Sequence, residues 1–126
     1  MTHYDGWAIA TSPDGLEAYG HLPAGTRICA WVKKNGQPGA HRIHSLWEPV
    51  IVYPPADRMS NRAGRGSVPD VLIVRAPRVG FVGAKPLEWV TWVLDLLGYQ
   101  DGDVVEDLFP GSGLVSEALR QTRLTV

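Results

Sequence analysis

Apolar residues in the first half of the chain fall in short runs that are rich in β-branched and aromatic side chains. This pattern is typical of strands. The predicted strands are Gly6 to Thr11, Arg27 to Lys33 and Leu46 to Tyr53. Between the second and the third lie the turn-forming pairs Asn35-Gly36 and Pro38-Gly39, which allow the chain to reverse. We therefore expect these two strands to form an antiparallel pair with a long connection.

Prolines and glycines mark where the first predicted elements end. Ser12 is a helix-capping residue and Pro13 is compatible with a first helical turn, so a short helix is predicted from Pro13 to about Tyr19, ending at Gly20. Pro49 lies inside the third predicted strand, where it removes a backbone donor. That strand therefore needs a bulge or an unpaired edge at this position.

The second half of the chain carries the clearest helical pattern. A helix is predicted to begin at Pro86 and to stop at Gly98. Its apolar residues recur at helical spacing: Val90, Val93, Leu94 and Leu97. A short strand over Val104 to Phe109 and a second helix from Leu114 to about Gln121 are predicted to follow, separated by a tight glycine-rich turn.

The segment from Pro54 to Pro69 is rich in Pro, Gly, Ser and Arg, and it precedes a short apolar run from Val71 to Val74. We predict an irregular, basic excursion over residues 54–70. Five arginines crowd into residues 58–78, within and just after this excursion: Arg58, Arg62, Arg65, Arg75 and Arg78. They are either a solvated loop or a surface that meets a phosphate backbone, and Arg58, Arg62 and Arg65 are the candidate DNA contacts.

Composition limits the class of protein. With 126 residues, of which 44% are hydrophobic and 20% charged, the chain is expected to fold as one globular domain over residues 1–126. It shows neither a signal peptide nor an apolar run long enough to cross a membrane, so a cytoplasmic location is expected. The single cysteine, Cys29, lies in an apolar stretch and is expected to be buried and unreactive.

Candidate chemistry is concentrated at Asp107 to Gly113, which reads DLFPGSG between a predicted strand and a predicted helix. Glycine lets a ligand approach the backbone amides at a helix N-terminus closely. The dinucleotide pattern G-x-G-x-x-G and the P-loop are both absent from the sequence. By itself, the G-x-G is also compatible with a turn that merely requires glycine.

DLFPGSG resembles the D-P-F-x-G-S-G signature of the S-adenosylmethionine-dependent DNA amino-methyltransferases, which modify adenine N6 or cytosine N4. Gly83-Ala84-Lys85-Pro86, just upstream and followed by a helix, resembles the family's Lys-Pro segment on the cofactor side. The order of the motifs is that of the circularly permuted members. Trp31-Val32-Lys33 and Trp47-Glu48-Pro49-Val50 look like two strands that those members place earlier.

The resemblance implies an α/β, Rossmann-like methyltransferase fold with a mixed sheet, and S-adenosylmethionine as cofactor. It assigns cofactor contacts to Lys85 and Pro86 and to the turn residues Asp107, Phe109, Pro110, Gly111, Ser112 and Gly113. Asp107 would accept a charge-assisted hydrogen bond from the cofactor's ammonium group. The target is expected to be DNA, with adenine N6 as the methylated atom.

The family's catalytic motif is Asp, Asn or Ser followed by Pro-Pro and an aromatic residue, and the sequence holds no intact copy. Ser12-Pro13-Asp14-Gly15 and Tyr53-Pro54-Pro55-Ala56 are partial matches that we interpret as decoys. The motif normally precedes the strand that corresponds to Gly6 to Thr11, so the chain is expected to begin after it.

In the family's sheet, the strand with the catalytic motif lies between the cofactor strand and the next one. Its loss would leave a central slot with unpaired backbone groups. A partner chain, a swapped homodimer or a reassignment of Gly6 to Thr11 could fill this slot. The last option would make Ser12-Pro13-Asp14-Gly15 a degenerate active site.

Two functions therefore remain open: an enzyme completed by another segment or chain, and a non-catalytic methyltransferase-like module that acts through protein or DNA contacts. No metal is expected, because the four histidines show no metal-binding spacing: His3, His21, His41 and His44. Four of the five tryptophans fall in predicted strands or in the long helix and are expected in the core or an interface. Trp47 stays open as a stacking residue.

Overall fold

The structure is a computed structural model that describes residues 4–35, 38–60, 66–77 and 85–107. The predicted turn after Asp107 and the predicted helix from Leu114 lie outside these ranges, as do Arg62, Arg65 and Arg78.

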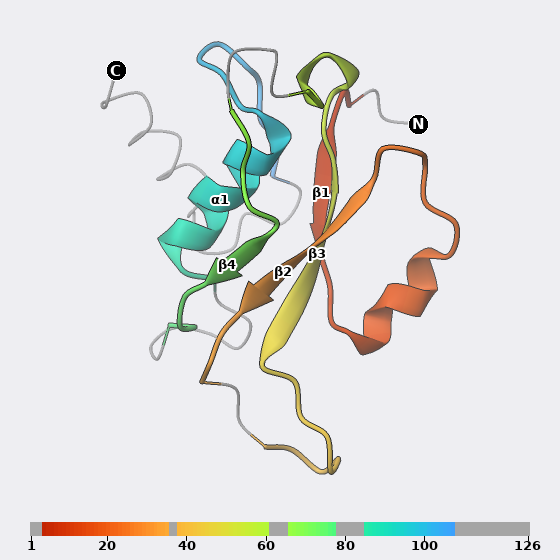
Figure 1. The fold of residues 1–126 in the computed structure, drawn as a ribbon, viewed down its shortest axis with the longest axis vertical. Helices are drawn as coiled ribbons and strands as arrows, with labels where there is room; N and C mark the ends of the chain where they lie inside the picture. The colour runs from red at the N-terminus through yellow and green to blue at the C-terminus, as the bar shows by residue number, and fades with distance from the viewer. Residues whose placement is uncertain (1–3, 36–37, 61–65, 78–84, 108–126) are drawn as a thin grey trace.

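A mixed sheet forms the centre of the described chain (Figure 1). Its strands are β1 (Trp7–Ala10), β2 (Arg27–Val32), β3 (Trp47–Tyr53) and β4 (Val71–Ile73), in the spatial order β1-β3-β2-β4. β3 is antiparallel to both β1 and β2, whereas β2 and β4 are parallel. The sequence predicted β1, β2 and β3 to within one residue at each end, and the antiparallel pairing of β2 with β3 is confirmed. β4 falls in the segment that the sequence marked only as a short apolar run.

Pro49 lies in an interior strand, opposite Ala30 of β2. Its carbonyl accepts a hydrogen bond from the N–H of Thr11 at 3.1 Å, one residue beyond the end of β1. In an extended strand the nitrogen and the carbonyl of one residue point to the same side, so the donor that proline lacks also faces Thr11. Pro49 thus lies opposite the point where β1 ends. Its nitrogen, which has no hydrogen to donate, needs no partner there, as the sequence predicted.

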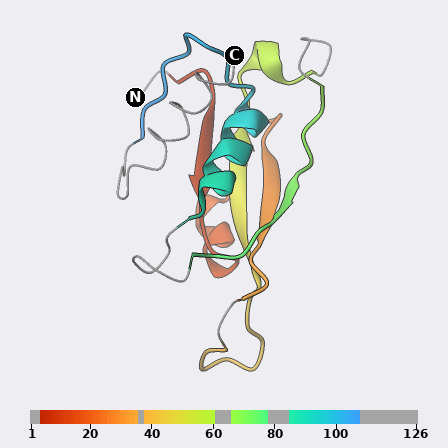
Figure 2. The same cartoon turned by 90° about the vertical axis from the view of Figure 1, so that its left-hand side faces the viewer.

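The short helix predicted after Ser12 is a 3₁₀-helix, η1 (Asp14–Tyr19). Ser12 Oγ accepts a hydrogen bond from the N–H of Gly15 at 3.0 Å. The hydroxyl therefore serves the first turn of η1, in agreement with its interpretation as a capping residue. η1 and α1 lie on opposite sides of the sheet, as Figures 1 and 2 show.

The predicted long helix is confirmed as α1 (Leu87–Leu97), preceded by Pro86 and ended by Gly98 in the left-handed conformation with φ +75°. Its buried side chains are Val90, Trp92, Val93 and Leu94. The main core joins helix and sheet through Cys29, Trp31, Val50, Val52, Trp92 and Val93. Full burial of one such aliphatic side chain contributes about 1.5–3 kcal/mol, so this face of the sheet is what holds α1 in place.

The prediction of a strand over Val104 to Phe109 is wrong for its described part. Residues 104–107 belong to no strand, while Leu108 and Phe109 lie outside the described ranges. Val105 packs against the cluster of Val90 and Leu94, but Val104 is 96% exposed. A strand requires a neighbour that pairs with its backbone groups, and the described sheet offers this segment none.

The excursion after β3 contains one short 3₁₀-turn, η2 (Ala56–Arg58), and the rest of its described part is irregular as predicted. Within the described residues, none of the helices has the length and apolar character that a membrane span requires.

Candidate functional site

The structure describes three of the residues that the methyltransferase resemblance assigns to the cofactor: Lys85, Pro86 and Asp107. Lys85 and Pro86 immediately precede α1, and Asp107 follows the turn at its far end. Phe109, Pro110, Gly111, Ser112 and Gly113 lie outside the described ranges.

After α1 the chain turns back along the helix. The turn spans Gly98 to Asp103, and Val105 then packs against Val90 and Leu94 in the middle of α1. The segment 104–107 therefore runs opposite to α1, towards the end where the helix begins (Figure 2).

Arg58 holds this turn together. Its Nη1 and Nη2 donate to the two carboxylate oxygens of Asp103, the second at 3.0 Å, and Nη1 also donates to the carbonyl of Gly98 at 3.2 Å. Asp103 Oδ2 further accepts from the N–H of Gln100 at 2.7 Å. The hydrogen bond that Arg58 donates to Asp103 raises the pKa of the Arg58 guanidinium. Arg58 thus has a structural contact of its own, and its proposed contact with DNA stays a prediction.

Lys85 is part of a compact charged cluster at the start of α1. Glu48 of β3 accepts hydrogen bonds from Lys85 and from Lys33, each at 3.0 Å. The Lys85 ammonium also lies 5.4 Å from the ring centroid of Trp31 and 5.8 Å from that of Trp89, within the range of cation–π attraction. These five residues, which we call the Glu48 cluster, tie β2 and β3 to the start of α1.

Two opposing effects set the pKa of Glu48. Burial of the carboxylate raises it, whereas the hydrogen bonds and charges of Lys85 and Lys33 lower it, and the net pKa lies below its ordinary value. The carboxylate is therefore charged at neutral pH and holds both lysines.

Glu106 connects the segment 104–107 to the residues before β1. Its carboxylate accepts a hydrogen bond from the hydroxyl of Tyr4, 102 positions earlier in the chain. The segment that leads to the glycine-rich motif therefore lies near the β1 side of the sheet, and Figure 2 shows it beyond β1.

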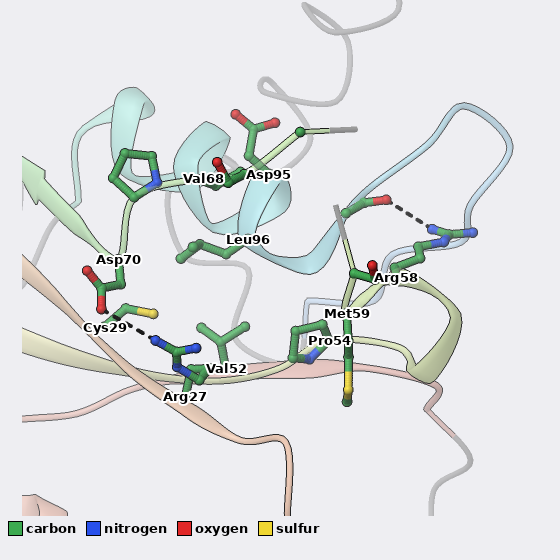
Figure 3. A pocket seen from close by; sticks show the side chains of 15 residues that line it. Arg27, Cys29, Val52, Pro54, Arg58, Met59, Val68, Asp70, Asp95 and Leu96 are labelled. Carbon is green, nitrogen blue, oxygen red and sulfur yellow. Dashed lines mark hydrogen bonds and ion pairs between the residues drawn. The ribbon is translucent and has the colours of Figure 1, made fainter. Parts of the chain in front are cut away.

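A groove of about 1040 Å³ opens elsewhere, between the end of α1 and the residues around 66–70 (Figure 3). Cys29, Val52 and Leu96 give it an apolar lining. Its charged residues have both signs: Arg27 and Asp70 form an exposed ion pair at 3.8 Å, and Arg58 and Asp95 also line it. Burial raises the pKa of the Cys29 thiol, so this cysteine is a poor nucleophile.

Sequence reasoning missed the Glu48 cluster, the Arg58–Asp103 pair and the groove. Each joins residues from separate segments, and only the Trp-Glu-Pro and Lys-Pro sequences gave a signal, through the family resemblance. In the described part of the chain, no three His, Cys, Asp or Glu side chains gather in a way that would hold a metal ion.

Comparisons of the chain with protein-family models, with curated proteins and with solved structures found no match.

Glu48→Gln should destabilise the fold at neutral pH by about 1–3 kcal/mol, because hydrogen bonds to a charged acceptor are lost. A carboxyl with a lowered folded pKa stabilises fully above its ordinary value of 4.5 and loses this contribution as the pH falls through the folded value. The difference in stability between wild type and variant should therefore shrink below pH 4.5. Thermal unfolding from neutral to acidic pH measures it, with exposed Glu88→Gln as the control. A difference independent of pH contradicts the prediction.

Proposed function

We propose that this chain is the S-adenosylmethionine-binding portion of a DNA amino-methyltransferase that acts on adenine N6. We further propose that it becomes active only when another segment or chain supplies the catalytic motif. The observation that carries the proposal is DLFPGSG at 107–113, preceded by Lys85-Pro86 with a single helix between the two motifs.

The course of the chain supports this assignment. α1 begins directly after Pro86, the Arg58–Asp103 pair holds the turn at its other end, and residues 104–107 run back along the helix. Residues 104–107 therefore run in the direction of the end of α1 that carries Lys85 and Pro86. Two motifs that are separated by a helix in sequence would then face one ligand from one end of the fold, where a helix N-terminus favours polar and anionic groups.

The residues at this end fit the chemistry of the cofactor. When bound, S-adenosylmethionine supplies an activated methyl group. Its amino-acid end carries an ammonium that the exposed carboxylate of Asp107 would attract, and the glycines at 111 and 113 would let backbone amides approach it. The Glu48 cluster keeps Lys85 at the start of α1, so that Pro86 and the helix have a fixed position.

The edge of β1 supports the second part of the proposal. The N–H of Thr11 points towards β3, so the backbone groups of Ala8 and Ala10 point away from it. In the described sheet no strand pairs with that side. We propose that a strand with the catalytic motif, of which the sequence holds no intact copy, pairs with this edge of β1.

The open edge also bears on the alternatives. In the described sheet β1 lies at an edge, so residues 6–11 do not occupy the central position that the third alternative requires. Ser12, which that alternative would make catalytic, has its hydroxyl engaged at the start of η1. A non-catalytic module remains the second candidate function, favoured by the missing catalytic motif.

Gly111→Leu should weaken S-adenosylmethionine binding by about tenfold or more, a loss of about 1.4 kcal/mol or more, because a branched side chain would obstruct the approach to the backbone of the turn. Calorimetric titration of the full chain measures the affinity. Gly39→Leu is the matched control, since a Cβ at Gly39 meets nothing within 4 Å.

Loss of binding in Gly111→Leu alone supports a cofactor site at the motif. Equal affinities of the two variants move the cofactor away from the motif, and no binding by the native chain overturns the proposed cofactor function.

Ala8→Pro should leave the stability of the chain within about 1 kcal/mol of the native value, because proline is tolerated where the N–H faces outward from a sheet edge. Ile9→Pro, one position later, removes a donor that faces β3 and should cost about 3 kcal/mol or more. Chemical denaturation of both variants tests the open edge. Comparable losses would mean that the β1 edge is already paired.

A further inference from the structure

The loop between β2 and β3, residues 33–46, projects from the body of the fold (Figure 1). Every residue from 38 to 46 is exposed. The sequence around this loop is basic, because it holds no Asp or Glu from residue 18 to residue 47. The loop itself carries three cationic side chains and two histidines: Lys33, Lys34, Arg42, His41 and His44. It is therefore a positively charged projection, which we call the basic loop.

The base of the basic loop is held by hydrogen bonds. The N–H of Lys33 donates to the carbonyl of Leu46 at 2.7 Å and closes the loop. Asn35 Nδ2 donates to the carbonyl of Ala76 at 3.2 Å, and Asn35 Oδ1 accepts from the N–H of Ala76 at 3.0 Å. Lys34, between these contacts, has φ +67°, a conformation that a residue other than glycine keeps only where its surroundings fix it. The loop thus leaves β2 in a fixed direction.

Two cations of the basic loop have no acidic partner. Lys33 is bound to Glu48 at 3.0 Å, whereas in the described part of the chain neither Lys34 nor Arg42 pairs with a carboxylate. Exposed cations of this kind attract a phosphate backbone, because each phosphate that they neutralise releases counterions. The imidazoles of His41 and His44 add hydrogen-bond donors for phosphate oxygens.

An aliphatic side chain lies among these basic residues. Ile43 is 80% exposed and stands between Arg42 and His44 in the sequence. Proteins that bend or open a DNA duplex insert such apolar side chains between its base steps, while nearby basic residues hold the backbone. A membrane surface is less well matched, because binding to it scales with the apolar area that is buried and one side chain supplies little.

The basic loop leaves the fold at the end that carries the start of α1. Lys33 and Glu48 lie where the loop begins and ends, and Glu48 also binds Lys85 at 3.0 Å, just before Pro86. Figures 1 and 2 both show the start of α1 at this end of the sheet. A duplex held by the basic loop would therefore lie beside the described residues that the resemblance assigns to the cofactor.

We propose that the basic loop is a DNA-binding surface, in which Lys34 and Arg42 contact phosphates and Ile43 inserts between base steps of the duplex. That this surface brings DNA to the cofactor rests on the proposed function. The contact between the loop and DNA follows from charge and exposure, and it requires no cofactor.

Fluorescence anisotropy of a labelled DNA duplex, titrated with the full chain at several salt concentrations, tests the phosphate contacts. Arg42→Gln should weaken binding and reduce the slope of log K against log salt concentration by about 0.9, the loss of one phosphate contact. Arg42→Lys keeps the charge and should retain the native slope. Arg27→Gln is the matched control, because Arg27 is an exposed arginine at the opposite end of β2, and its affinity and slope should be native.

The same titration separates the aliphatic contact from the charged ones. Ile43→Ala should weaken binding about tenfold at every salt concentration and leave the slope unchanged, because it removes apolar contact area and no charge. Val104→Ala is the matched control, since Val104 is 96% exposed and lies beyond the far end of α1. The thermal midpoints of these variants should equal that of the native chain, because the replaced side chains are exposed.

A native chain that binds no DNA overturns the proposal. So does a native slope in Arg42→Gln, a native affinity in Ile43→Ala, or binding to phosphatidylserine vesicles that both variants abolish. Calorimetry with S-adenosylmethionine separates this proposal from the proposed function. Loop-dependent DNA binding without cofactor binding upholds the DNA surface and overturns the cofactor function, whereas cofactor binding without DNA binding does the reverse.

Discussion

The packing of α1 against the sheet is the interaction on which the rest of the described structure depends. Trp92 and Val93 of the helix meet Val50 and Val52 of β3 in one core. Because β3 lies between β1 and β2, this contact fixes the helix relative to the interior strand of the sheet. The described chain is held at both ends of α1: the Glu48 cluster lies at the start of the helix, and the Arg58–Asp103 pair holds the turn at its end.

The edges of the sheet pose a physical problem that bears on the proposed function. Backbone groups that face outward from an edge strand must be hydrated or must pair with another strand. At β1 the backbone groups of Ala8 and Ala10 face outward, and this is the edge at which we propose that a strand with the catalytic motif pairs.

Sequence patterns predicted the parts of the fold that local physics decides. β1, β2, β3 and α1 follow from the apolar pattern and from Pro86 and Gly98 at the helix ends, whereas the sequence marks β4 only as a short apolar run. The predicted strand over Val104 to Phe109 is absent from its described part, 104–107. An apolar pattern forms a strand only where a neighbouring strand pairs with its backbone groups. Contacts such as Lys85–Glu48 and Arg58–Asp103 join residues 37 and 45 positions apart and leave no local signature. The motif DLFPGSG is recognisable from sequence, but a likeness of residues does not itself measure binding.

Hydrogen–deuterium exchange of the full chain with and without S-adenosylmethionine tests the central claim most directly, because it reports where the ligand acts. The account predicts slower exchange in two peptides, one covering Asp107 to Gly113 and the other covering the start of α1 after Lys85. Slower exchange confined to the groove lined by Cys29, Val52 and Leu96 would contradict it, as would no change anywhere in the chain at saturating ligand.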